Sequence, residues 1–161
     1  MENIRKSIIY VDGLRFNLVS MRYRMKKQYE IFPAQSNEKM FEILECFPKF
    51  KHKNPDLILL DICMPDIEGF KALKTLKRNI RFREIPVVIA SLKQDRKTVL
   101  EAMELGAAAF IAKPFSDSYL IERIEPLLNP EIVKSRGDIL EEIAANHIRT
   151  YGSSYKTEAV S

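Results

Sequence analysis

Two kinds of hydrophobic pattern alternate along the chain. Short runs rich in Ile, Val and Leu indicate buried strands, and each is followed by a longer stretch with apolar residues at helical spacing. We expect strands at residues 7–11, 29–33, 57–60, 87–90 and 109–112. We expect helices at about residues 16–27, 37–47, 69–79, 96–105 and 117–128. The chain is therefore a fivefold strand–helix repeat.

These predicted strands are apolar along their whole length, which is typical of strands covered by helices on both faces. Five such units predict an α/β fold, a doubly wound five-stranded parallel sheet. The C-terminal ends of parallel strands meet at one edge of the sheet, and sites form there, where the strand order reverses. The residues directly after the strands are therefore the candidates for chemistry.

Polar residues follow four of the five strands: Asp12, Asp61, Ser91 and Lys113. One such residue alone is more often a loop residue or a helix cap, but four at one edge favour a site. Neighbouring carboxylates repel each other unless a cation lies between them, and Mg²⁺ prefers oxygen ligands. We therefore expect a magnesium site where Asp61 attacks a phosphoryl group, Lys113 neutralises charge and Ser91 donates a hydrogen bond.

The segments around these positions resemble the receiver domain of two-component response regulators. DLILLDICMPDIEGF at 56–70 resembles the family's strand, phosphoacceptor Asp, Met-Pro turn and acidic-Gly pair. VVIAS ends at Ser91, and GAAAFIAKPF at 106–115 carries the Lys-Pro pair. The resemblance covers residues 4–128 and implies a flavodoxin-like sheet of order 2-1-3-4-5. It implies a phosphorelay protein that is not itself an enzyme, phosphorylated by a sensor histidine kinase or a phosphotransfer protein.

The resemblance also implies individual roles. Asp61 would be the phosphoacceptor, assisted by Lys113 and Ser91. The Mg²⁺ ligands would be Asp12, Asp61 and the main-chain carbonyl of Cys63. Ser91 and Phe110 would form the switch, in which the aromatic ring rotates as the hydroxyl moves. The bond from Lys113 to Pro114 would be cis.

Gly13 departs from the family pattern, which has two successive acidic residues after the first strand. In the family the second acid coordinates the metal directly, so we expect Mg²⁺ binding to be weakened and phosphoryl transfer to be slowed. Two interpretations remain. Phosphorylation survives with a weaker metal site, which is favoured because Asp61, Ser91 and Lys113 are all present. Alternatively, the chain is an atypical receiver that acts as a protein-interaction module with weak or no phosphorylation.

Two other classes that share such a fold are disfavoured. A phosphatase of the haloacid dehalogenase type needs a second Asp two residues after its nucleophile, where this chain has Cys63. A nucleotide or flavin binder needs a Gly-rich turn after the first strand, and the chain has only five glycines with no such turn.

Length, charge and hydropathy indicate the number of domains, the kinds of partner and the cellular location that we expect. A length of 161 residues predicts one domain. The net charge is +4, but the Lys and Arg residues are interspersed with Asp and Glu along the sequence, so we expect no direct binding to nucleic acid. No apolar run approaches a membrane span, and there is no secretory signal, so we expect no membrane association and a cytoplasmic location.

Residues 129–161 leave the family pattern. Asp138 and Glu141 are spaced to cap an extra, short amphipathic helix, and a flexible tail is expected from about Thr150. Three roles are open for the apolar face of that helix: packing on the receiver, forming a homodimer, or leading to an output domain absent from this sequence. A downstream protein target is expected on the family's usual partner face, formed by the fourth and fifth helices.

Overall fold

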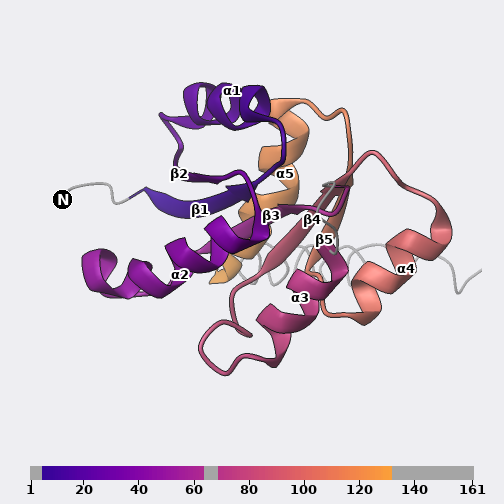
Figure 1. Ribbon diagram of the computed structural model, residues 1–161. Helices are drawn as coiled ribbons and strands as arrows, with labels where there is room; N and C mark the ends of the chain where they lie inside the picture. Colours follow the sequence, from indigo (N-terminus) through magenta and orange to yellow (C-terminus); the bar gives the residue numbers. More distant parts are fainter. Residues whose placement is uncertain (1–4, 64–68, 132–161) are drawn as a thin grey trace, which may run out of the picture. The chain divides into compact units, whose positions relative to one another are not determined.

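The structure is a computed structural model that describes residues 5–63 and 69–131, and its contacts divide the chain after Leu128. Strands and helices alternate in the first unit: β1 Lys6–Val11, α1 Arg15–Met25, β2 Tyr29–Ala34, α2 Asn37–Lys51, β3 Leu57–Asp61, α3 Gly69–Arg78, β4 Val87–Ser91, α4 Arg96–Glu104, β5 Ala109–Ala112 and α5 Asp117–Leu128. All strand pairs are parallel, in the order β2-β1-β3-β4-β5 (Figure 1). The predicted doubly wound sheet and its strand order are confirmed.

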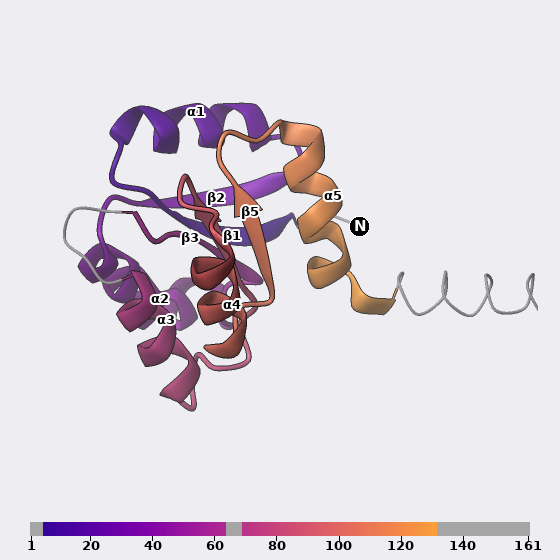
Figure 2. The ribbon, with the colours of Figure 1, turned by 90° about the vertical axis from the view of Figure 1, so that its right-hand side faces the viewer.

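Helices cover both faces of the sheet, because the alternation of side chains along each strand supplies two apolar surfaces. On one face Ile8 and Tyr10 pack with residues of α1 and α5, among them Leu18 and Ile124. On the other face Ile9 packs with residues of α2, α3 and α4. Figure 2 shows the separation of these two helix layers from a second direction. Within the described residues, no helix is long and apolar enough to span a membrane.

Helix α2 continues four residues beyond the end that the sequence predicts. Pro48 lies in its last turn, and the helix ends at Lys51. The capping residue His52 has a left-handed φ of 58°, and its N–H donates to the Pro48 carbonyl. The rings of Phe32, Phe47 and Phe50 explain the extension: the centroid distances are 4.9 Å for Phe32–Phe47 and 5.1 Å for Phe47–Phe50. The contact of Phe50, two residues beyond Pro48, with Phe47 favours continuation of the helix past the missing N–H of the proline.

The predicted extra C-terminal helix and tail, apart from residues 129–131, lie outside the described residues. The same holds for residues 64–68, which include the predicted Met-Pro turn and the acidic residue of the acidic-Gly pair.

Gly106 offers a direct test of the turn between α4 and β5. Its φ is +96°, and an added Cβ would lie 3.3 Å from Cγ of Lys77. We expect Gly106→Ala to lower the free energy of unfolding by about 1–2 kcal/mol, because alanine is strained in that conformation. Urea unfolding would measure the change. Glu104→Ala, at an exposed position two residues earlier, is the control and should stay within about 0.5 kcal/mol of wild type.

Candidate functional site

Asp12 lies where β1 ends, and its side chain is 1% exposed. Its Oδ2 accepts hydrogen bonds from the Tyr10 hydroxyl at 2.6 Å, the Asn17 side-chain amide at 2.9 Å and Nζ of Lys113 at 2.7 Å. Its Oδ1 accepts the main-chain N–H of Leu14 at 2.8 Å. Both oxygens of this buried carboxylate are therefore engaged by donors.

Asp61 ends β3 and shares the same ammonium group. Nζ of Lys113 lies 2.8 Å from Oδ2 of Asp61, and the N–H of Cys63 donates to Oδ1 at 2.7 Å. Lys113 comes from the end of β5, more than a hundred residues after Asp12 in the sequence, and its side chain is 12% exposed. The sheet thus brings two carboxylates and one ammonium into direct contact, as the sequence predicts for these three residues.

Hydrogen bonds within this cluster favour the charged forms of Asp12 and Lys113. Burial alone would raise the pKa of Asp12, but the hydrogen bonds from Lys113, Tyr10, Leu14 and Asn17 outweigh it and lower that pKa. Burial alone would lower the pKa of Lys113, but its bonds to the two carboxylates raise it. Burial and the bond to Asp12 raise the pKa of Tyr10 above its usual range, so this residue stays a neutral donor. At neutral pH Asp12 is an anion and Lys113 a cation.

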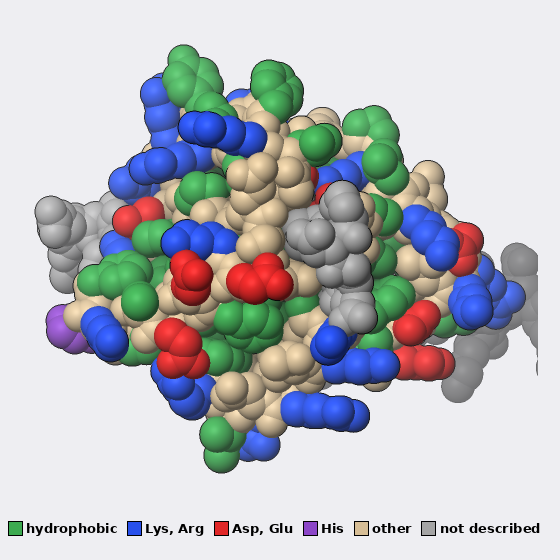
Figure 3. Space-filling view, viewed as in Figure 1, with side chains coloured by type: hydrophobic (Ala, Val, Ile, Leu, Met, Phe, Trp, Pro, Cys, Tyr) green, Lys and Arg blue, Asp and Glu red, His purple; other side chains and the backbone are tan. Residues whose placement is uncertain are grey.

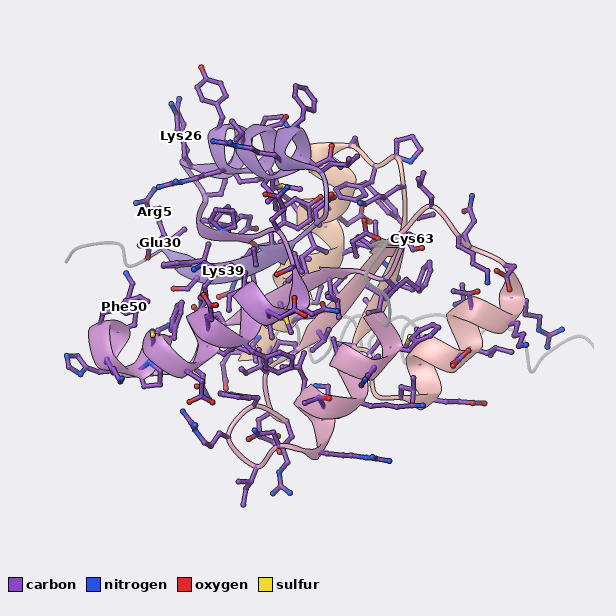
Figure 4. The ribbon with its side chains drawn as sticks, viewed as in Figure 1. Arg5, Lys26, Glu30, Lys39, Phe50 and Cys63 are labelled. Carbon is purple, nitrogen blue, oxygen red and sulfur yellow. The ribbon has the colours of Figure 1, made fainter. Side chains whose placement is uncertain are left out.

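Ser91 ends β4 and is fully buried. Its Oγ lies 3.0 Å from Sγ of Cys63 and accepts the N–H of Lys93 at 3.0 Å. Strand pairing holds it in place, because Asp61 lies beside Ala90 in the register of β3 and β4. Ser91 therefore joins the cluster through Cys63, which lies two residues beyond the end of β3 and is labelled in Figure 4.

Phe110 and the Lys113–Pro114 bond complete the set of predicted residues. Phe110 pairs with Ile89 across β4 and β5, and it is partly buried against the core beneath α2, α3 and α4. Its role as a switch stays a prediction. The bond between Lys113 and Pro114 is cis, as the resemblance implies.

The fit of the site to a divalent cation is partial. No group of three His, Cys, Asp or Glu side chains suited to a metal occurs among the described residues, and Gly13 adds no side-chain oxygen. Asp61, Gly13 and Cys63 line a cavity of about 510 Å³ that also reaches Asp12. The carboxylate of Asp61 and the main-chain carbonyl of Cys63 are suitable oxygen donors, although both oxygens of Asp61, like both oxygens of Asp12, already accept hydrogen bonds. This donor set suits a weakly held Mg²⁺ that keeps most of its waters.

The sequence analysis missed Tyr10 and Asn17, which hold Asp12. A signal for Tyr10 was present, since residues two apart in a strand point to the same face. For Asn17 the signal was weak, because only the turn between β1 and α1 brings its amide back to the strand end.

Comparisons with known families and proteins match this chain to response regulators and their receiver domain. The family model described as "Response regulator receiver domain" matches residues 8–125. The chemotaxis protein CheY of Bacillus subtilis is 35% identical over 123 residues, which are 76% of this chain and 97% of CheY. A probable cyclic di-GMP phosphodiesterase of Vibrio cholerae is 30% identical over 146 residues, 88% of this chain. PhoB, the phosphate regulon transcriptional regulatory protein of Shigella flexneri, is 37% identical over 90 residues, 52% of this chain.

Two of these relatives are much longer than the matched part. The matches span 32% of the Vibrio protein and 39% of PhoB. Among solved structures, a CheY-like receiver domain protein from Methanospirillum hungatei has a TM-score of 0.69 at 22% identity, covering 81% of this chain and 98% of that one. The receiver domain of a histidine kinase from Syntrophus aciditrophicus has a TM-score of 0.66 at 25% identity, covering 78% and 91%.

Proposed function

Because the chain belongs to the response regulator receiver domain family, we propose that it accepts a phosphoryl group on Asp61 and thereby changes its binding to a partner protein. The observation that carries the proposal is the ammonium of Lys113, held 2.8 Å from the Asp61 carboxylate at a buried sheet edge. An ammonium in that position favours the approach of an anionic phosphodonor and stabilises charge that develops on the phosphoryl oxygens.

In the proposed reaction an oxygen of Asp61 attacks phosphorus, and the bond from phosphorus to its donor breaks. The donor leaves with the bonding electrons, and Asp61 becomes an acyl phosphate. Lys113 neutralises charge on the phosphoryl oxygens, and the hydroxyl of Ser91 can turn from Cys63 to donate to one of them. Bound Mg²⁺, with Asp61 and the Cys63 carbonyl as ligands and Asp12 behind them, would supply further positive charge.

The partners follow from the family. We propose that a sensor histidine kinase or a phosphotransfer protein in the cytoplasm is the donor, and that a downstream protein or an output domain reads the change. The new phosphoryl contact would favour one of two conformations through Ser91 and Phe110. The phosphodiesterase activity in the name of the Vibrio relative is that of a longer protein, of which the match covers 32%.

A second function is a receiver that acts as an interaction module with weak or no phosphorylation. It is favoured by Gly13 in place of an acid and by the four hydrogen bonds that already occupy Asp12. Incubation with acetyl phosphate separates the two functions: an acyl phosphate on Asp61 supports the first, and its absence supports the second.

Restoring the missing acid tests the weakened metal site. We expect Gly13→Asp to bind Mg²⁺ at least tenfold more tightly than wild type, because it adds a carboxylate at the cavity that Gly13 lines. Isothermal titration with MgCl₂ would measure the affinity. Gly13→Asn, which adds a neutral side chain of similar size, is the control. Equal Mg²⁺ affinities for wild type and Gly13→Asp would contradict the idea that Gly13 weakens the site.

A further inference from the structure

A groove of about 1230 Å³ runs along the free edge of the sheet, where β2 has no neighbouring strand among the described residues. Five consecutive residues of β2, from Tyr29 to Pro33, line it, and α1 and the start of α2 contribute its walls. No described residue lines both this groove and the cavity at Asp61. The groove is therefore a separate feature of the surface.

Its lining is strongly basic. The Lys and Arg residues that line it are Arg5, Arg15, Arg22, Lys26 and Lys39. Glu30 is the one acidic residue among the described residues of the lining, and Lys51 neutralises it at 2.7 Å. Figure 3 shows Lys and Arg side chains gathered over α1 and beside it, and Figure 4 shows Arg5, Lys26 and Lys39 on the same side of the molecule as Glu30. This lining favours a ligand that carries negative charge.

Two of the cations are available to such a ligand. Arg15 and Arg22 are seven residues apart on α1, which places them on one helix face, and both are exposed. Neither makes an ion pair with any described residue. Apolar surface lies between the charges, since the exposed Val19 and Tyr23 belong to the same wall and Lys26 lies over the Tyr23 ring at 4.3 Å from its centroid.

The floor of the groove offers main-chain groups. The N–H of Asp12 donates to the carbonyl of Ala34 at 3.1 Å, so Ala34 turns its polar groups toward β1. Because these groups alternate along a strand, Tyr29, Ile31 and Pro33 turn theirs away from β1, into the groove. Proline is tolerated there since its missing N–H falls on the unpaired side. Ile31 thus presents both an N–H and a carbonyl to an incoming strand.

We propose that this groove binds an acidic, extended segment of a partner protein, which adds as a sixth strand beside β2. The exposed arginines fit its carboxylates, and the free strand edge fits its main chain. A nucleic acid could satisfy the positive charge but not the alternating main-chain groups, so a peptide is the favoured ligand. The inference goes beyond phosphorylation of Asp61 and is tested without a phosphodonor, so either proposal can fail alone.

The test uses a fluorescein-labelled decapeptide of alternating Glu and Val, with the full chain and fluorescence anisotropy. We expect saturable binding that weakens at least tenfold in the double variant Arg15→Glu, Arg22→Glu. The matched control Arg96→Glu, Lys97→Glu makes the same charge change on exposed positions of α4 and should bind as wild type. Hydrogen exchange should show that the peptide protects the amide of Ile31.

Three results would overturn the proposal. One is the absence of saturable peptide binding. Another is an equal loss of binding in both double variants, which would indicate general charge attraction. The third is saturable binding without protection of Ile31, which would show that the peptide does not add as a strand; equally tight binding of a single-stranded DNA of matched charge would then indicate a nucleic-acid surface.

Discussion

In the Lys113→Met variant we expect the free energy of unfolding at pH 7 to fall by about 3 kcal/mol, because two buried carboxylates lose the ammonium that pairs them. Asp12 and Asp61 lie 2.7 and 2.8 Å from Nζ, and all three side chains are at most 12% exposed. Methionine keeps much of the lysine volume, so the loss reports on charge more than on packing. Urea unfolding at several pH values would measure it.

The stability difference between wild type and Lys113→Met should depend on pH, and the pKa of Asp12 sets the direction of that dependence. In wild type the pKa of Asp12 is lowered on folding, so its contribution is present above the unfolded pKa of about 3.9 and is lost as the pH falls through the folded pKa. Without the hydrogen bond from Lys113, we expect burial to raise the pKa of Asp12 above its unfolded value, so protonation of Asp12 stabilises the variant as the pH falls. The difference between wild type and variant should therefore be largest near pH 7 and shrink toward pH 4.

The pair of Lys51 and Glu30 provides the control. Nζ of Lys51 lies 2.7 Å from Oε2 of Glu30, but the two side chains are 32% and 35% exposed. Lys51→Met should therefore lower the free energy of unfolding by less than about 1 kcal/mol. A loss in Lys113→Met as small as this, and constant from pH 4 to 7, would show that the shared ammonium does not stabilise the site.

The arrangement of Asp12, Asp61 and Lys113 could be predicted because it follows from the fold alone. Parallel strands end at one edge, so residues at three strand ends meet there whatever the details of the loops. The strands themselves could be predicted because their apolar runs are continuous and buried, as β3 and β4 are throughout.

What could not be predicted depends on contacts between distant or irregular segments. The extension of α2 beyond Pro48 rests on rings from β2 and α2 that meet only in the folded chain. The partners of Asp12 depend on the turn into α1, which returns Asn17 to the end of β1. The basic groove was missed for a similar reason: Arg5, Arg22 and Lys39 are scattered in the sequence, and only the fold gathers them beside β2.

The Asp61→Asn variant should lose phosphoryl acceptance completely, which is the largest functional effect that we expect. An amide oxygen is a poor nucleophile, but the asparagine side chain is close in shape to that of aspartate and can still accept the Cys63 N–H on its oxygen. The fold should therefore persist while the acceptor is lost. Asp117→Asn removes an exposed carboxylate on α5, paired with Arg24, and is the matched control.

The measurement that tests the central claim most directly is the intact mass of the protein after incubation with acetyl phosphate and MgCl₂. Wild type and Asp117→Asn should gain the mass of one phosphoryl group, and Asp61→Asn should gain none. An equal gain in Asp61→Asn, or no gain in wild type, would contradict the proposal that this receiver acts by phosphorylation of Asp61.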